Sequence, residues 1–332
     1  MATSQDFATW TCGPKLLPRF LFHALRAMAP DLKRIAAGST HKTIYMPDIE
    51  RLRIPVPPVE EQRRIADFLD AETARIDQAV EKMRTQLALL GEHEVAAVYA
   101  AVSGSSVAGD RKHSGMEWLG DIPADWPVAS VSSQFQIQLG KMLNQERRRG
   151  SRLRPYLRVL NVQWDHIDVS ELVEMDFPES ERVRYEVLPG DLLICEGGSY
   201  PGRAAIWKGQ LPEMYYQKAL HRARSRGRSS VRWLYYCLYL ALEMGVFHAE
   251  GNSSTITHLT GEQLAARRFP FPDPEVQAVL IANLDAEGEA RKRVRKARET
   301  QIVLLEERRR AVITAAVTGK LDVTTARRTS PV

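Results

Sequence analysis

Two stretches of the chain carry apolar residues at the spacing of a long helix that packs along one stripe. Those of the first are Leu69, Ile76, Val80, Met83, Leu87 and Leu90. Those of the second, less regularly spaced, are Leu284, Ile302 and Leu305. Spacing that alternates between three and four residues is typical of a coiled-coil seam. We predict that the two helices pair with each other within the chain, with a seam between two copies of the chain as the alternative.

The two stretches are copies of each other, related by a shift of 215 positions without a gap. IPVPPVEEQRRIADFLDAE begins at residue 54 and FPFPDPEVQAVLIANLDAE at residue 269. In the second copy Asp273 can cap a helix whose first position is Pro274. Gly104 and Gly319 are plausible C-terminal stops. The predicted helices therefore span residues 58–104 and 273–320.

The region between the helices has a different pattern. Residues 105–116 are small, polar and unpatterned, which predicts a linker. Short β-type runs separated by turns follow, including YLRVLNV and VLPGDLLICEGG, with one helix near residues 230–247. Residues 117–272 are therefore predicted to be a β-rich domain, and the fold class is α+β.

Charge gives the first indication of a partner. The net charge is +5, with seven Lys and Arg against one acid in residues 141–158 and six with no acid in residues 218–232. Such clusters can attract phosphates, and they can equally be solvated loops. Three cysteines without a CxxC motif indicate a reducing, cytoplasmic context and no cysteine-rich zinc site. The longest apolar stretch is too short to span a bilayer, so we expect no membrane partner.

Five motifs in order carry a resemblance to a known family. They are WLGDIPADW, YLRVLNVQ, LPGDLLICEGGSYPGRAAIW, YQKALHRAR and FPFPDPEVQ with the helix that follows it. Together they resemble the DNA-specificity (S) subunit of type I restriction-modification systems, over residues 117–320.

The resemblance implies two target recognition domains, each followed by a long helix, with the helices packed as an antiparallel coiled coil. It implies a non-catalytic subunit that binds double-stranded DNA, docks modification (methyltransferase) subunits through the helices, and directs adenine methylation and restriction in anti-phage defence. Restriction subunits join through the complex. No cofactor is expected on this chain; S-adenosylmethionine, ATP and Mg are expected only on partner subunits.

The sequence departs from the family's plan in its first part. Residues 1–57 resemble only the C-terminal remnant of a first recognition domain, and about 100 residues of that domain have no counterpart. We expect a truncated chain, a start site assigned too late, or a natural short form that reassembles with another chain. A disordered tail is expected at residues 321–332.

The resemblance also supplies candidate DNA contacts in the second recognition domain. They are Gln163, Tyr200, Arg203, Gln217, Lys218 and Arg222. Glutamine can pair with adenine and arginine with guanine, whereas Lys218 is better suited to phosphate. The alternative is that Tyr200 only packs and Arg203 only pairs with an acid such as Glu196.

Enzymatic interpretations lack their motifs. The chain has no phosphate-binding glycine loop and no second histidine after HEVAA, and Cys195 is expected to be a buried strand residue. Two alternatives to a DNA-reading subunit stay open. One is a coiled-coil scaffold that binds modification subunits without reading DNA, and the other is a stand-alone DNA-binding protein. A homodimer is a further possibility.

Overall fold

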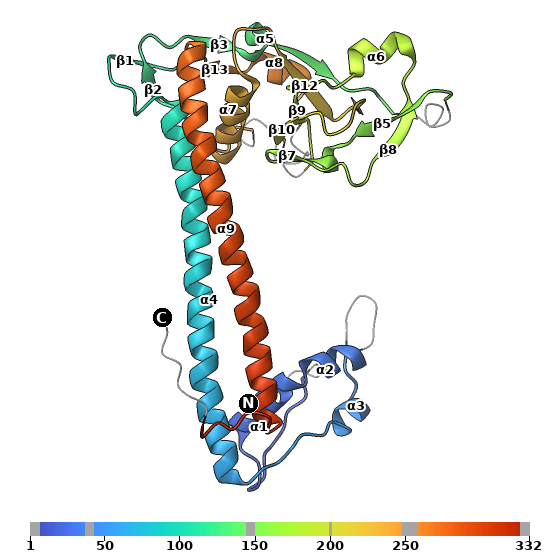
Figure 1. Ribbon diagram of the computed structural model, residues 1–332, viewed down its shortest axis with the longest axis vertical. Coiled ribbons are helices and arrows are strands. Elements are labelled where there is room, and N and C mark those ends of the chain that lie inside the picture. The colour runs from blue at the N-terminus through green and yellow to red at the C-terminus, as the bar shows by residue number, and fades with distance from the viewer. Residues whose placement is uncertain (1–6, 37–42, 144–149, 199–200, 248–257, 326–332) are drawn as a thin grey trace. The chain divides into compact units, whose positions relative to one another are not determined.

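The computed structural model describes residues 7–36, 43–143, 150–198, 201–247 and 258–325 (Figure 1). The chain divides into two compact units. Unit 1 comprises residues 1–90 and 292–332, and unit 2 comprises residues 91–291. Long helices combine with several small sheets, which confirms the α+β fold class.

The two long helices are α4 (Val59–Val102) and α9 (Pro274–Val317), each of 44 residues. The predicted start at Pro274 is confirmed. Helix α4 stops at a glycine C-cap: Gly104 has φ +61°, its N–H donates to the Ala101 carbonyl at 3.2 Å, and the Ser105 N–H donates to the Ala100 carbonyl at 3.0 Å. This pair of bonds is the Schellman motif, which glycine favours because it lacks a Cβ.

Within unit 1, α4 and α9 pack antiparallel. Leu69 is fully buried in a cluster with Ile313 and Ala316. Arg84 lies later in α4 and pairs at 3.2 Å with Glu306, which lies earlier in α9, so the two helices run in opposite directions. The other ion pairs between the two helices in this unit are Arg308–Glu72 and Arg309–Asp77, both at 3.0 Å. Most of these side chains are substantially exposed, so each pair contributes little to stability and mainly complements the apolar stripe.

The predicted seam residues differ in burial. Leu69, Ile76, Val80 and Leu284 are buried. Leu284 belongs to unit 2, where it joins a cluster with the end of α4, including Val98 and Val102. Partly exposed positions are Met83, Leu87, Leu90, Ile302 and Leu305. The buried seam positions therefore lie in the first half of α4 and the first third of α9.

The rest of unit 1 is built from α1 (Pro18–Ala27), α2 (Ala29–Ile35) and α3 (Met46–Glu50). Phe20 and Ala24 of α1 pack onto the cluster around Leu69. Leu321 and Val323 also pack against this cluster. The prediction of a disordered tail is wrong for these residues, because their side chains cover apolar surface, and residues 326–332 lie outside the described part of the chain.

The named strands of the described residues all lie in unit 2. The largest sheet has the order β10-β9-β12-β4, with β10 (Ala204–Ile206), β9 (Leu192–Cys195), β12 (Leu220–Ser225) and β4 (Phe135–Leu139). All its pairs are antiparallel. A second sheet has the order β11-β5-β8, with β11 (Tyr215–Tyr216), β5 (Leu153–Leu157) and β8 (Val173–Asp176).

Three two-stranded pairs complete the strands of unit 2. They are β1 (Arg111–His113) with β2 (Asp121–Pro123), β3 (Val128–Ser130) with β13 (Arg268–Pro270), and β6 (Val162–Gln163) with β7 (His166–Ile167). The short helices are α5 (Val131–Gln134), α6 (Glu179–Tyr185), α7 (Val231–Glu243) and α8 (Gly261–Ala266).

The predicted linker at residues 105–116 is structured. Arg111 opens strand β1, and its guanidinium donates to the carbonyls of Ser103 and Gly104, both at 3.1 Å. These bonds bind the segment to the end of α4. The prediction is wrong because polar, unpatterned sequence does not reveal pairing with a strand ten residues later.

Helix α7 forms the centre of the main core. Trp233 is fully buried, lies edge-on to Trp126 at 6.2 Å between ring centroids, and donates its indole N–H to the Pro270 carbonyl at 2.8 Å. The contact with Trp126 packs the start of this domain against α7.

The repeat in sequence corresponds to a repeat in hydrogen bonding. Gln62 and Gln277 are both buried. In unit 1, Gln62 donates to the Pro57 carbonyl at 2.7 Å and accepts from the N–H of Leu17, the N-cap residue of α1, at 2.8 Å. In unit 2, Gln277 donates to the Pro272 carbonyl at 2.7 Å and accepts from the N–H of Ser230, the N-cap residue of α7, at 3.0 Å.

An aspartate about two helical turns after each glutamine repeats in the same way. Asp70 accepts from Arg19 and is bonded to His23, both at 2.8 Å, on α1. Asp285 accepts from Arg232 at 2.8 Å and from the Tyr236 hydroxyl on α7. Each copy of the repeat therefore docks one short helix onto one long helix through the same two positions.

Candidate nucleic-acid interface

A groove of about 850 Å³ lies at one end of the β11-β5-β8 sheet. It is lined by Leu143, Pro155, Tyr156, Arg158, Leu172, Val173, Glu174 and Gln217. The lining combines apolar side chains with one cation, one anion and one amide. A phosphate-binding surface would instead be dominated by lysine and arginine.

Strand pairing brings Arg158 and Gln217 side by side. Strands β5 and β11 are parallel, with Leu157 opposite Tyr216. Arg158 and Gln217 are the next residues of these strands, and the Gln217 N–H donates to the Leu157 carbonyl at 3.1 Å, which continues the ladder. Neighbouring strands lie about 4.8 Å apart, so the two side chains leave the backbone close together.

A close backbone contact fixes the loop after β11. A Cβ placed on Gly140 would lie 2.2 Å from the Gln217 carbonyl oxygen, so only glycine fits there. The Lys218 N–H donates to the Lys141 carbonyl at 2.7 Å, while the Lys218 side chain is exposed. Lys141 itself is buried and pairs with Glu181. The loop therefore presents Gln217 and Lys218 on a rigid base.

The other predicted contacts are placed less favourably. Gln163 is exposed in β6, and its amide donates to the Leu160 carbonyl at 2.9 Å. Arg203 is half-buried and donates to the Val159 carbonyl at 3.3 Å. Tyr200 lies outside the described residues, as do Arg147 to Arg149 of the first basic stretch.

Arg222 was assigned wrongly to the surface. Its side chain is 2% exposed, its guanidinium donates to the Glu186 carbonyl, and it lies 5.7 Å from the centre of the Tyr216 ring. Arg222 occupies the middle of β12, between β9 and β4, so other elements cover it. A buried arginine with these contacts holds the domain together and cannot reach DNA from this position.

Arg158 is the residue that the sequence analysis missed. Among the described residues no hydrogen-bond or ion-pair partner reaches its guanidinium, and its Nε is buried. Two other arginines of unit 2 are neutralised: Arg224 forms two bonds of 2.7 Å to Asp191, and Arg232 pairs with Asp165 and Asp285. The sequence offered one signal for Arg158. It directly follows Tyr156 and Leu157 in the motif YLRVLNVQ.

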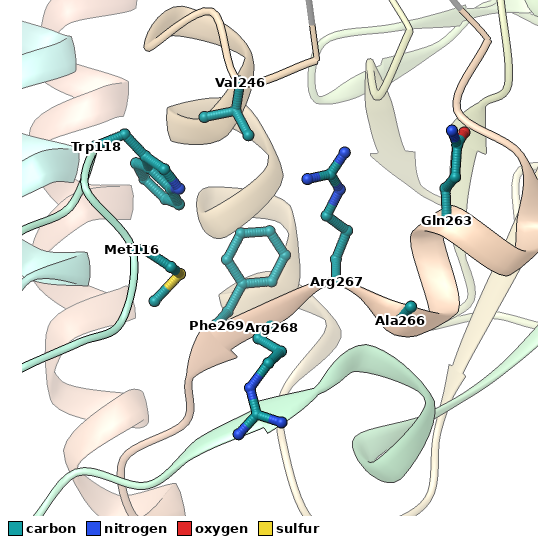
Figure 2. Close-up of a pocket in the computed structure, with 8 residues that line it drawn as sticks. All are labelled: Met116, Trp118, Val246, Gln263, Ala266, Arg267, Arg268 and Phe269. Atoms are coloured by element: carbon teal, nitrogen blue, oxygen red, sulfur yellow. The ribbon is translucent and has the colours of Figure 1, made fainter. Parts of the chain in front are cut away.

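A second pocket, of about 320 Å³, lies between the loop before β2, α8 and β13. Figure 2 shows Met116 and Trp118 facing Phe269, with the Arg267 side chain extending beside the ring. Trp118 and Phe269 meet edge-to-face at 6.3 Å. The lining contains no carboxylate, histidine or cysteine, so the pocket has no acid–base or nucleophilic group for catalysis.

The described residues contain no cluster of three or more His, Cys, Asp or Glu side chains arranged to hold a metal ion. Cys195 is fully buried in β9, as expected, and burial raises the pKa of its thiol, which disfavours the nucleophilic thiolate. In the same part of the chain, no helix has the length and apolar character needed to cross a membrane.

Comparison with known proteins agrees with these observations. Residues 1–86 match the family described as the type I restriction modification DNA specificity domain. The specificity subunit of the type I restriction enzyme EcoKI from Escherichia coli K12 is 25% identical over 197 residues, which are 58% of this chain and 41% of the relative. Over these stretches the chain is similar to type I specificity subunits.

Further relatives come from Methanocaldococcus jannaschii. A putative MjaX specificity subunit is 36% identical over 67 residues, 20% of this chain and 15% of the relative. The MjaVIII specificity subunit is 25% identical over 122 residues, 37% of this chain and 27% of the relative. The chain thus spans less than half the length of the curated relatives that it matches.

Two solved structures share the fold. The HsdS subunit from Thermoanaerobacter tengcongensis has a TM-score of 0.52 at 20% identity and covers 92% of this chain and 70% of its own. A chain from a type I R-M system, solved in a study of complex assembly and conformational transition, has a TM-score of 0.62 at 21% identity and covers 92% and 72%. Both confirm the arrangement of small sheets and long helices.

Proposed function

We propose that this chain is a non-catalytic DNA-recognition subunit of a type I restriction-modification complex. It chooses double-stranded DNA sites at which partner subunits methylate adenine and cut DNA, in defence against phage. The observation that carries the proposal is the groove of unit 2, where neighbouring polar side chains without internal partners are available to read base edges.

The parts of the chain have separate roles in this proposal. Unit 2 reads DNA through Gln217 and Lys218, with Gln163 and Arg203 as further candidate contacts. The helices α4 and α9 dock modification subunits, and restriction subunits join through the assembled complex. In this proposal S-adenosylmethionine, ATP and Mg are bound by those partner subunits.

The proposal is tested by selection from a random DNA pool with the full chain bound to its modification subunit. We expect one enriched sequence. Lys218→Ala weakens binding to all sequences and reduces the slope of log affinity against log salt by about 1, because one phosphate contact is lost. Lys208→Ala, which removes an exposed lysine elsewhere in unit 2, serves as the control.

Each alternative gives a distinct result. A scaffold that does not read DNA forms the complex but enriches no sequence. A stand-alone DNA-binding protein enriches the same sequence without the modification subunit. An enriched sequence made of two identical inverted halves indicates that two copies of the chain act together.

A further inference from the structure

The unpaired state of Arg158 is unusual for a side chain with a buried Nε. Charged groups removed from water are normally paired, because an unpaired one loses its hydration without compensation. Arg158 lines an open groove, so its outer nitrogens are available to a ligand that supplies acceptors.

The composition of the groove favours a base edge over a phosphate as that ligand. Glu174 lies in the same groove, is exposed, and forms no ion pair with Arg158 among the described side chains. A carboxylate repels phosphate but can accept a hydrogen bond from the amino group of cytosine. Leu172 and Val173 provide apolar surface suited to a thymine methyl group. The groove therefore offers the chemistry of base recognition.

The ladder between β5 and β11 adds a geometric argument. Arg158 and Gln217 follow strand positions that pair in register, so they occupy neighbouring strands at about 4.8 Å. Stacked base pairs are separated by about 3.4 Å. Two side chains at such similar spacing can contact two adjacent base pairs. Arginine is bidentate to guanine O6 and N7, and glutamine to adenine N6 and N7.

We propose that Arg158 is a specificity-determining residue that reads a guanine, with Gln217 contacting the adjacent base pair. The inference rests on the proposed function, because it assumes that unit 2 binds DNA. The base-reading arginine directly follows strand β5, so the strand holds its side chain in place.

The test compares sequences selected by the full chain, bound to its modification subunit, as wild type, Arg158→Lys, Arg158→Gln and Arg228→Gln. Arg228 is an exposed arginine of the same unit and controls for net charge. We expect both Arg158 variants to lose preference for guanine at one position by roughly 5- to 150-fold, the range of one bidentate contact. The Arg228→Gln variant keeps the wild-type sequence.

The outcomes separate this inference from the proposed function. If the wild-type complex selects no sequence, the proposed function fails. If it selects a sequence that Arg158→Gln leaves unchanged at every position, only the present inference fails. A third outcome also overturns the inference. If Arg158→Lys keeps the selected sequence and Arg158→Gln binds all sequences more weakly, Arg158 contacts a phosphate and does not read a base.

Folding of the variants is checked by thermal unfolding. Should Arg158→Gln unfold, Gln217→Ala tests the same geometry, since its side chain lacks an internal hydrogen bond among the described residues. We expect loss of preference at a single position next to the guanine. If Gln217→Ala leaves the base preference unchanged at every position, the proposal that Arg158 and Gln217 contact adjacent base pairs is overturned.

Discussion

The buried Gln277 should be a major determinant of the stability of unit 2. Its amide bonds the Pro272 carbonyl at 2.7 Å and Ser229 Oγ at 3.2 Å, and its oxygen accepts from the Ser230 N–H at 3.0 Å. The residue thus joins the start of α9 to the start of α7. Gln277→Leu has a similar volume but removes all three bonds.

The expected loss can be worked from these contacts. The substitution leaves two backbone groups, the Ser230 N–H and the Pro272 carbonyl, buried without these partners. Each such group costs about 1–3 kcal/mol, partly offset by the greater apolar character of leucine. We expect the free energy of unfolding to fall by about 2–4 kcal/mol. At a urea dependence of about 2–3 kcal/mol per M, the midpoint falls by about 1 M.

Tryptophan fluorescence is a suitable assay, because five of the six tryptophans lie in unit 2. Gln86→Leu, at an exposed position of α4, is the control and should change stability by no more than about 0.5 kcal/mol. A midpoint for Gln277→Leu within about 0.2 M of the wild type, as expected of the control, would refute the reasoning, since it would mean that the buried bonds contribute no net stability.

Three other substitutions have expected outcomes. Leu69→Ala removes a fully buried side chain and should cost unit 1 about 2–5 kcal/mol in urea unfolding followed by circular dichroism; a cost below about 1 kcal/mol contradicts the core assignment. Gly104→Ala should lower the melting temperature, because φ is +61° and the new Cβ would lie 2.7 Å from the Pro123 ring, whereas Gly91→Ala, with open space in α4, should leave it unchanged or raise it. Burial lowers the pKa of His23, so its neutral form stabilises the fold above about pH 6.5 and that stability is lost as pH falls; His23→Gln should flatten the decline in unfolding free energy below that pH, and an unchanged slope counts against it.

The long helices were predictable because several local signals agree over many residues. The apolar spacing, the prolines before each copy and the glycine stops each indicate the same element, and α4 and α9 begin and end within two or three residues of the predicted bounds. The roles of Gln62 and Gln277 were hidden despite their place in the repeat. A glutamine in a helix normally reads as a surface residue, and only the folded contacts show its carbonyl and N–H partners.

The candidate interface was predicted less well, because burial of an arginine depends on distant elements. The sequence analysis placed Arg222 among the DNA contacts, yet Arg222 is covered and donates to the Glu186 carbonyl, 36 residues earlier. Arg158 was overlooked for the converse reason. Its proximity to Gln217 follows from parallel pairing of β5 with β11, which local sequence does not reveal.

The most direct test of DNA recognition is a map of adenine methylation in cells that express the chain with its modification subunit, compared with cells that express the modification subunit alone. The account predicts one methylated sequence motif that appears only when the chain is present. A stable complex that adds no methylated motif would contradict it, since the chain would then be a scaffold that does not read DNA.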